Sequence, residues 1–324
     1  MNIAQDTAYE AHLAAYLDSR LPDRVYDGHF HIRGDRYLAE GITAGTYEPY
    51  LSFAAETLGA HRLAGGLVMP PPTTLDVLHG DNAYNLALAE KEGYEAGLLI
   101  APEQTREEVE AKLDTHTCIR ALKPYLSYLP ADRRFEADIL EFAPEWIFAL
   151  ANDRALPVII HLSHYGNMLS ERANYEQVRY LAEKYPRMKL VLAHCAMGHH
   201  IGKLKMGLPH IMGLKNVWFD CSGSTEALAV HACLKAFGTD RMIYGTDFNH
   251  GASLGRICSF GSNFIGFHPG IVDENAIPPD YRYQPLSNAV EGLVSLFDAG
   301  DLLSLTDKDY EKIFFHTAKE VFGE

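Results

Sequence analysis

Short apolar segments alternate with longer segments of helical periodicity through most of this chain. Runs such as Val158-Ile159-Ile160 and Leu190-Val191-Leu192 are continuously apolar rather than alternating. This is typical of parallel strands that are buried on both faces. Eight segments of this kind are predicted as strands, at 25–29, 65–69, 96–100, 119–123, 158–161, 190–194, 217–220 and 242–246.

A helix-like segment follows each predicted strand, at 50–58, 83–92, 106–113, 141–152, 176–184, 203–212, 227–237 and 286–297. Further helices are expected at 9–19 and 307–322. Eight strand–helix units in succession predict an α/β fold of the (β/α)8, or TIM, barrel type. The alternative, a doubly wound open sheet, would be expected to have a Gly-rich phosphate loop after its first strand. That position holds Gly28-His29-Phe30-His31 with no GxGxxG motif, so the barrel is favoured.

Two segments interrupt the alternation, 33–47 after the first strand and 248–285 after the eighth. The second is a long predicted loop rich in Gly, Pro and aromatic residues, including Phe260, Phe264, Phe267, His268, Tyr281 and Tyr283. This aromatic content argues against disorder, and long loops in compact domains are usually functional. No repeat or linker divides the sequence, so a single domain over 1–324 is predicted.

Composition excludes several classes of protein. With 324 residues, 47% of them hydrophobic, the chain can bury a large core. The formal net charge is −15 and no run of Lys and Arg is present, so nucleic acid is not expected as a partner. The five cysteines are widely spaced without a CxxC pair and read as reduced thiols. No signal peptide or membrane-spanning run is recognisable, so a cytoplasmic protein with a small-molecule substrate is expected.

Ionisable residues stand at the ends of several predicted strands, each directly after an apolar run. They are His29 and His31 on the first strand, Lys123 on the fourth, His161 on the fifth, His194 on the sixth and Asp247 on the eighth. In a parallel barrel the carboxyl ends of all strands open on one face, where catalytic groups collect. These side chains are therefore expected to converge at one barrel mouth.

The pair His29 and His31 is the starting point for a metal site. Alternate residues of a strand point to the same face, so both imidazoles point together while Phe30 points away. An isolated His-x-His pair is a weak motif, but further histidines and a carboxylate make a set that suits a divalent ion such as Zn. Asp247 can also accept a proton from water, and His194 is a ligand, a base or an electrophile that polarises a carbonyl.

These motifs resemble the amidohydrolase superfamily, in particular its amidohydrolase-2 branch of metal-dependent TIM-barrel hydrolases and related decarboxylases. The resemblance rests on Asp27-Gly-His29-Phe-His31, Lys123-Pro124, Ile160-His161, Leu192-Ala193-His194, Tyr244-Gly245-Thr246-Asp247-Phe248 and the closing segment 313–322. It implies a single divalent ion, expected to be Zn with Mn or another ion as alternatives. The implied ligands are His29, His31, His161 and Asp247, and the implied catalytic residues are Asp247 and His194.

The resemblance leaves two roles open for Lys123. In binuclear members of the superfamily a carboxylated lysine at the end of the fourth strand bridges two metals. An uncarboxylated Lys123 would instead contact a substrate anion, because an ammonium is a compact donor for carboxylates. The second role is favoured.

One departure from the branch bears on the reaction. Decarboxylases of this branch often carry His-x-Gly-Glu after the sixth strand, whereas this chain has His194-Cys195-Ala196-Met197. Hydrolysis is therefore predicted, with a metal-bound hydroxide attacking the carbonyl carbon of a small lactone, amide or ester-like substrate that carries a carboxylate. Nonoxidative decarboxylation of an aromatic or unsaturated carboxylic acid is the alternative, and a binding barrel without turnover is a third.

Other polar residues have weaker assignments. Arg33 and Arg256 are predicted to bind a substrate carboxylate, and His164 either lines the pocket or is exposed. The pair His199-His200 is interpreted as a solvated helix start, and Cys195 as core packing. A symmetric homo-oligomer is possible for such a barrel, without a predicted number of subunits.

Overall fold

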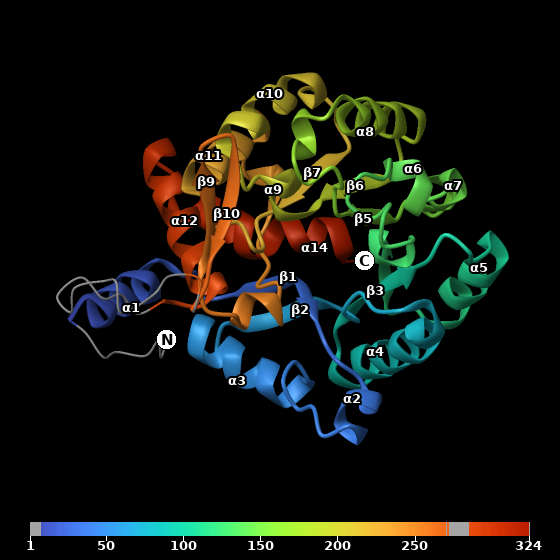
Figure 1. Cartoon of the computed structure of the whole chain (residues 1–324). Coiled ribbons are helices and arrows are strands. Elements are labelled where there is room, and N and C mark those ends of the chain that lie inside the picture. The colour runs from blue at the N-terminus through green and yellow to red at the C-terminus, as the bar shows by residue number, and fades with distance from the viewer. Residues whose placement is uncertain (1–7, 270, 272–284, 324) are drawn as a thin grey trace.

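Eight parallel strands form the centre of the molecule, in the order β1 to β8 around a nearly closed barrel. The computed structural model describes residues 8–269, 271 and 285–323 (Figure 1). The strands are β1 Val25–His31, β2 Leu63–Met69, β3 Glu95–Ile100, β4 Ile119–Pro124, β5 Pro157–Ile160, β6 Lys189–Leu192, β7 Val217–Asp220 and β8 Met242–Ile243. The predicted (β/α)8 barrel is confirmed.

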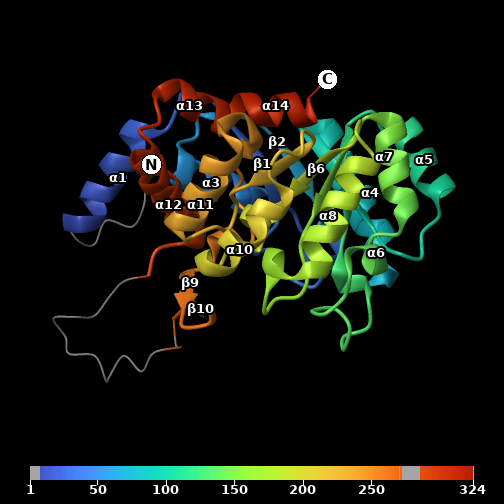
Figure 2. The same ribbon diagram turned by 90° about the horizontal axis from the view of Figure 1, so that it is seen from above.

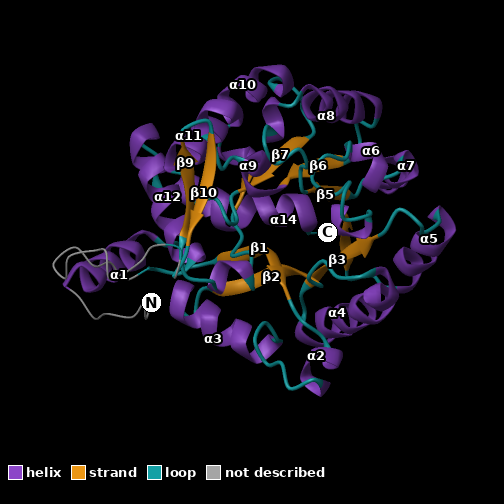
Figure 3. Cartoon of the chain, in the orientation of Figure 1, coloured by secondary structure: helices purple, strands orange, loops and turns teal. Residues whose placement is uncertain are grey.

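Helices surround the strands on the outside of the barrel (Figure 3). Those that precede β6 are α1 Ala8–Arg20, α2 Asp35–Ala39, α3 Tyr47–Leu58, α4 Leu78–Glu92, α5 Arg106–Thr115, α6 Ile139–Phe142, α7 Glu145–Arg154 and α8 Arg172–Lys184. Those that follow are α9 Ala193–Met197, α10 Ile201–Ile211, α11 Ala227–Phe237, α12 Asn288–Leu303, α13 Asp307–Glu311 and α14 Thr317–Phe322. No helix in the described part of the chain is long and apolar enough to span a membrane.

Each strand contributes to two hydrophobic clusters, which explains the continuously apolar sequences. On β5, Val158 and Ile160 pack into the layer between strands and helices, whereas Ile159 packs into the barrel interior. On β6, Val191 takes the interior position and Leu190 and Leu192 face the helices. Because neither face meets water, neither face needs polar residues.

The first and last strands of the barrel meet at a seam. The Gly28 amide donates to Tyr244 O at 2.9 Å, and the Asp247 amide donates to His29 O at 2.7 Å. Gly28 permits this approach, since a Cβ there would lie 2.4 Å from Ile243 Cγ2. The seam therefore brings the backbone of β1 beside the segment that follows β8.

The amino-terminal ends of the strands are closed by the C-terminal segment, seen beside the barrel in Figure 2. The predicted helix 307–322 is divided into α13, a π-helical turn over Lys312–His316 and α14. Phe315, Ala318, Val321 and Phe322 belong to the same buried cluster as the inward side chains of the strands.

The predicted loop 248–285 is partly wrong, because it contains a β-hairpin. Strands β9 Arg256–Phe260 and β10 Asn263–Phe267 pair antiparallel around Gly261, which has a φ of +59°. The two short runs of β-branched and aromatic residues flanking a Gly–Ser turn explain the hairpin. Tyr281 and Tyr283 lie outside the described residues. The other predicted loop, 33–47, contains α2.

Candidate metal centre and active site

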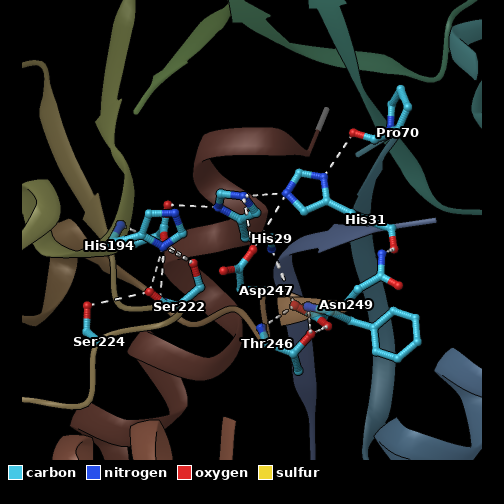
Figure 4. Close-up of polar contacts among 12 residues, drawn as sticks. His29, His31, Pro70, His194, Ser222, Ser224, Thr246, Asp247 and Asn249 are labelled. Atoms are coloured by element: carbon cyan, nitrogen blue, oxygen red, sulfur yellow. Dashed lines mark hydrogen bonds and ion pairs between the residues drawn. The ribbon is translucent and has the colours of Figure 1, made fainter. Parts of the chain in front are cut away.

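Three buried side chains meet at the seam, at the carboxyl ends of the strands (Figure 4). His29 Nε2 lies 3.2 Å from His31 Nε2. Asp247 Oδ1 lies 3.9 Å from His29 Nε2 and 3.6 Å from His31 Nε2. Among the described residues, these three form the one group whose ligand atoms are close enough together to hold a metal ion.

In both histidines the hydrogen bond made by Nδ1 determines the tautomer and the orientation of Nε2. His29 Nδ1 lies 3.1 Å from the Asp220 carboxylate, and His31 Nδ1 lies 2.9 Å from Pro70 O. Both partners only accept hydrogen bonds, so both Nδ1 atoms carry the proton. The two Nε2 atoms then face each other with lone pairs, an arrangement that a cation between them stabilises. The residues therefore fit a divalent metal ion.

The charge states agree with this fit. Burial lowers the pKa of His31 to about 3, with His29 adding to the effect, so the imidazole is neutral. Burial and Lys123 lower the pKa of His29 in the same direction. Burial alone would raise the pKa of Asp247, but His194 and the two other histidines lower it overall, so the carboxylate is ionised. Neutral imidazoles and an anionic oxygen are the ligand forms that bind metal.

Asp220 is a residue of this site that the sequence analysis missed. It ends β7 after Val-Trp-Phe, at the position where other strands carry site residues. One carboxylate oxygen accepts from His29 Nδ1, and the other accepts from the backbone amide of His194 at 3.2 Å and that of Ser222 at 3.1 Å. Asp220 thus ties a metal ligand to the sixth-strand segment. Its place at a strand end was the available signal.

His194 lies in a left-handed turn rather than at the end of a strand. The predicted strand 190–194 ends at Leu192, and residues 194–197 all have φ between +52° and +58°. His194 Nδ1 lies 2.8 Å from Ser222 O, so it donates there and leaves the Nε2 lone pair for the cavity. The His194 ring lies 5.2 Å from that of His29 and 5.3 Å from that of His161.

His161 lines the same cavity but is not one of the three clustered ligands. Its Nδ1 lies 3.2 Å from Leu162 O. Burial and the neighbouring His194 hold the pKa of His161 well below its usual value, so this imidazole is neutral as well. His161 therefore lies beside His194 in the cavity wall, outside the group of three ligands.

Lys123 is fully buried and is not among the residues that line the cavity. Its Nζ has no hydrogen-bond partner among the described residues, and it lies 5.6 Å from the centre of the Tyr125 ring. Burial lowers the pKa of Lys123 to about 8, against the opposing effect of Asp220 and Asp247. An unpartnered buried amine beside these ligands is compatible with either role considered above.

A cavity of about 450 Å³ opens above these residues. Its polar wall includes Arg33, His199, Asn249 and His250. Its apolar wall consists of Pro71, Pro72, Tyr125, Tyr165, Met197, Ile257 and Phe264, of which the last two belong to the β9–β10 hairpin. The cavity is thus large enough for a small cyclic or aromatic molecule, and its walls are mostly apolar.

Of the three residues with weaker predicted substrate roles, one lines the cavity and two do not. Arg33 lines the cavity. His164 is outside the lining residues, with Nε2 3.3 Å from Asp138 and Nδ1 3.5 Å from Glu136. Arg256 is also outside, on β9, where Nη2 donates to Thr225 O at 2.7 Å.

The interpretation of His199-His200 as a solvated helix start is wrong for His199. His199 is buried in the cavity wall, 5.3 Å from the Phe264 ring. His200 is the N-cap of α10, and its Nδ1 accepts from the Lys203 amide at 3.2 Å. Cys195 is buried in the core, as predicted. A hairpin formed far along the chain covers His199, so the local sequence held no sign of its burial.

Known proteins resemble this chain in sequence pattern and in fold. Residues 26–323 match the sequence model of the amidohydrolase family. A search of curated proteins finds no match. A solved structure of a candidate 2-pyrone-4,6-dicarboxylic acid hydrolase from Pseudomonas putida has 16% identity and a TM-score of 0.57, over 94% of this chain and 98% of that one.

Two other similar structures have different activities in their names. The 5-carboxyvanillate decarboxylase of Sphingomonas paucimobilis has 10% identity and a TM-score of 0.56, over 93% of this chain and 99% of that one. The 4-oxalomesaconate hydratase of Rhodopseudomonas palustris has 13% identity and a TM-score of 0.53, over 92% and 95%. At such identities the likeness shows the fold alone, while the family model covers nearly the whole chain. The chain therefore belongs to the amidohydrolase family, in its amidohydrolase-2 branch.

Proposed function

We propose that this protein is a metal-dependent hydrolase of a small carbonyl compound, a lactone, amide or ester that carries a carboxylate. The observation that carries the proposal is the place of Asp247. It is the one carboxylate among the described residues that line the cavity, and its Oδ1 lies 3.6 Å from the nearer ligand nitrogen. Hydrolysis needs a single group that takes a proton from water and returns it to the leaving group.

The metal would be held by His29, His31 and Asp247, with His161 as the fourth ligand. Zn is the ion we propose, because imidazole and carboxylate donors around an open position suit it. A divalent ion bound there supplies Lewis acidity, which polarises a substrate oxygen and lowers the pKa of water. Lys123 either carries a carboxylate of its own and adds a ligand, or remains an ammonium that attracts the substrate anion.

The other residues have roles that follow from their hydrogen bonds. Asp247 acts as the base, since its ionised carboxylate is adjacent to both ligand imidazoles. His194 presents the Nε2 lone pair, because Nδ1 donates to Ser222 O. In this orientation His194 is a second base or a ligand rather than an electrophile. Arg33 binds the substrate carboxylate in the cavity wall, whereas His164 and Arg256 support neighbouring protein groups.

Decarboxylation of an aromatic acid is the second candidate. The rings of Tyr125 and Tyr165 line the cavity together with Phe264. Both tyrosine rings also lie near His161, with centres 5.3 Å and 5.7 Å from that of the imidazole. A planar substrate would stack against such walls. This chemistry would use the same metal, and Asp247, after taking a proton from solvent, would deliver it to the ring carbon as carbon dioxide leaves.

Metal removal tests the centre, and the two substrate panels separate the reactions. Purified protein is expected to contain a divalent ion, to lose lactone, ester or amide hydrolysis on chelation, and to regain it with Zn. Asp247→Asn should lower kcat by roughly 10²–10⁴-fold, because the base is lost. Asp76→Asn, an exposed change from Asp to Asn, is the matched control. Carbon dioxide release from a panel of aromatic acids would instead favour the decarboxylase, and no metal-dependent turnover of either panel would reject both.

A further inference from the structure

A second cavity of about 510 Å³ adjoins the catalytic cavity. Arg33 and Asn249 line both, so they form the partition between them. The second cavity, called here the outer groove, is bounded by Phe53 and Phe248, whose rings lie 5.2 Å apart at 35°, and by Ser52 on α3 and Ser253. None of the residues with a proposed catalytic role lines it, yet it continues the space in which they lie.

At this partition, Arg33 has in its guanidinium a hydrogen-bond donor without a partner in the described part of the chain. Its backbone amide donates to Gly45 O at 2.8 Å and its Nη1 donates to Ala44 O at 3.0 Å, which fixes the side chain. Its Nε is buried and has no hydrogen-bond partner among the described residues. The edge formed by Nε and Nη2 matches the two oxygens of a carboxylate. A buried donor without a partner is destabilising unless a ligand supplies the acceptor.

We propose that the outer groove is a binding site for the distal part of the substrate. The substrate is then an organic acid with three parts: a reactive carbonyl in the catalytic cavity, a carboxylate on the Nε–Nη2 edge of Arg33, and a tail in the outer groove. The place of the reactive carbonyl rests on the proposed function. The places of the carboxylate and the tail rest on Arg33 and on the outer groove.

The chemistry of the groove selects the kind of tail. The half-buried ring of Phe53, which packs against the buried ring of Phe248, offers aromatic surface to the groove, and this favours an aliphatic chain or an aromatic ring. Glu56 lines the same groove and is exposed, so a second anion would be repelled there. The tail is therefore apolar and carries no negative charge, and the substrate is larger than the catalytic cavity alone would suggest.

Binding of simple acids tests this site without relying on turnover. Dissociation constants of propanoate, 5-phenylpentanoate and neutral 5-phenylpentanamide are measured by calorimetry on the full-length Zn-loaded protein, and again after chelation. In the wild type, 5-phenylpentanoate should bind roughly 10–100-fold more tightly than propanoate, because the ring is buried in the groove. Arg33→Gln should weaken both acids by roughly tenfold or more and leave the amide unchanged.

Variants of the groove provide the decisive comparison. Ser52→Trp fills the groove from α3 and Ser253→Trp fills it from the opposite side, and both positions are exposed. Each should reduce the preference for 5-phenylpentanoate to near unity while propanoate binding stays unchanged. Ser19→Trp, the same exposed change on α1, should keep the wild-type preference.

The outcomes separate this site from the proposed reaction. A preference for the long acid that survives both groove variants, or that is absent from the wild type, overturns the inference. If the protein hydrolyses short lactones but does not prefer 5-phenylpentanoate to propanoate, the proposed function stands and only the binding role of the outer groove is rejected. A preference abolished by the variants in a protein without hydrolytic activity would support the groove and reject the reaction.

Discussion

His199 is a buried imidazole whose neutral form the fold requires. It lies in the cavity wall beside Phe264, and burial, together with His194 and His250, lowers its pKa to about 3. In the unfolded chain a histidine has a pKa of about 6.5. The unfolded state therefore binds the proton first as the pH falls. The stability that His199 contributes is present above pH 6.5 and is lost progressively toward pH 3.

We expect His199→Gln to reduce the acid sensitivity of the fold. Between pH 7 and pH 5.5 the free energy of unfolding of the wild type should fall by about 1 kcal/mol more than that of the variant. The reason is that the variant, which lacks this imidazole, takes up one proton fewer when it unfolds. Urea unfolding at both pH values, with a chelator present so that metal release does not contribute, measures the difference. His79→Gln changes an exposed histidine and should match the wild type. Equal slopes in His199→Gln and the wild type would contradict the expectation.

Residue positions were predictable where the strand pattern fixed them. His29, His31 and Asp247 were expected at one barrel mouth, and their donor atoms meet there. A strand end specifies which edge a residue occupies, because parallel strands share one carboxyl edge. Loop residues carry no such rule. Arg33 and Arg256 looked alike in sequence, yet only Arg33 lines the cavity, because tertiary contacts orient each loop.

The β9–β10 hairpin supplies part of the apolar wall of the catalytic cavity. It is fixed to the segment after β7 by Thr225 and by Glu226, whose carboxylate accepts from the Ser259 amide at 2.9 Å. The Thr225 hydroxyl accepts from the Ile257 amide at 2.8 Å and donates to Ile257 O. On the other side, the Ile201 amide of α10 donates to the Ser259 hydroxyl at 3.2 Å. The hairpin thus holds Ile257 and Phe264 against the catalytic cavity from two sides.

Thr225→Val should loosen this hairpin without unfolding the barrel. Valine has the same shape but leaves the amide and carbonyl of Ile257 without partners, at roughly 1–3 kcal/mol for the unsatisfied groups. Amide hydrogen exchange over 256–267 should accelerate about tenfold or more, while exchange in β1 to β7 stays unchanged. Thr115→Val on α5, where the hydroxyl bonds only to Ala111 O, is the matched control. Unchanged exchange in the hairpin would show that Thr225 does not hold it.

At this scale the barrel strands and most helices were predicted, whereas the hairpin was predicted as part of a long loop despite the short β-type runs on either side of its turn. Buried parallel strands leave apolar runs that are visible without knowledge of the fold. No residue of the hairpin strands is fully buried: β9 is exposed at Arg256 and Phe260 and half-buried between them, so the strands resemble a loop rich in aromatic residues. Their conformation depends on Thr225, which lies in a segment far away in sequence.

The whole molecule depends on its C-terminal segment, which fills the barrel from below. Phe322 is buried and stacks on Tyr26 of β1, with ring centres 6.3 Å apart. Lys319 Nζ donates to Glu95 at 2.6 Å, at the start of β3. The sequence predicted a terminal helix, but whether it covered the outside or the interior of the barrel was not predictable, because both surfaces are apolar.

Phe322→Ala is therefore expected to destabilise the entire barrel. Removal of a buried phenyl ring leaves a cavity and should reduce the free energy of unfolding by about 3–5 kcal/mol. Denaturant unfolding measures this loss. Phe260→Ala removes the same ring from a hairpin position that is 70% exposed, and should stay within about 0.5 kcal/mol of the wild type. A loss below about 1 kcal/mol for Phe322→Ala would mean that the closing segment is not part of the core.

The seam between β1 and β8 has a consequence for how the protein is made. His29 and His31 are synthesised early, but Asp247 follows β8, and the Asp247 amide reaches His29 O only when the barrel is complete. A nascent chain still on the ribosome therefore lacks the full ligand set until nearly all of the barrel has emerged. Since an ion that binds only the closed barrel stabilises it by mass action, metal supply in the cell and completion of folding are thermodynamically linked.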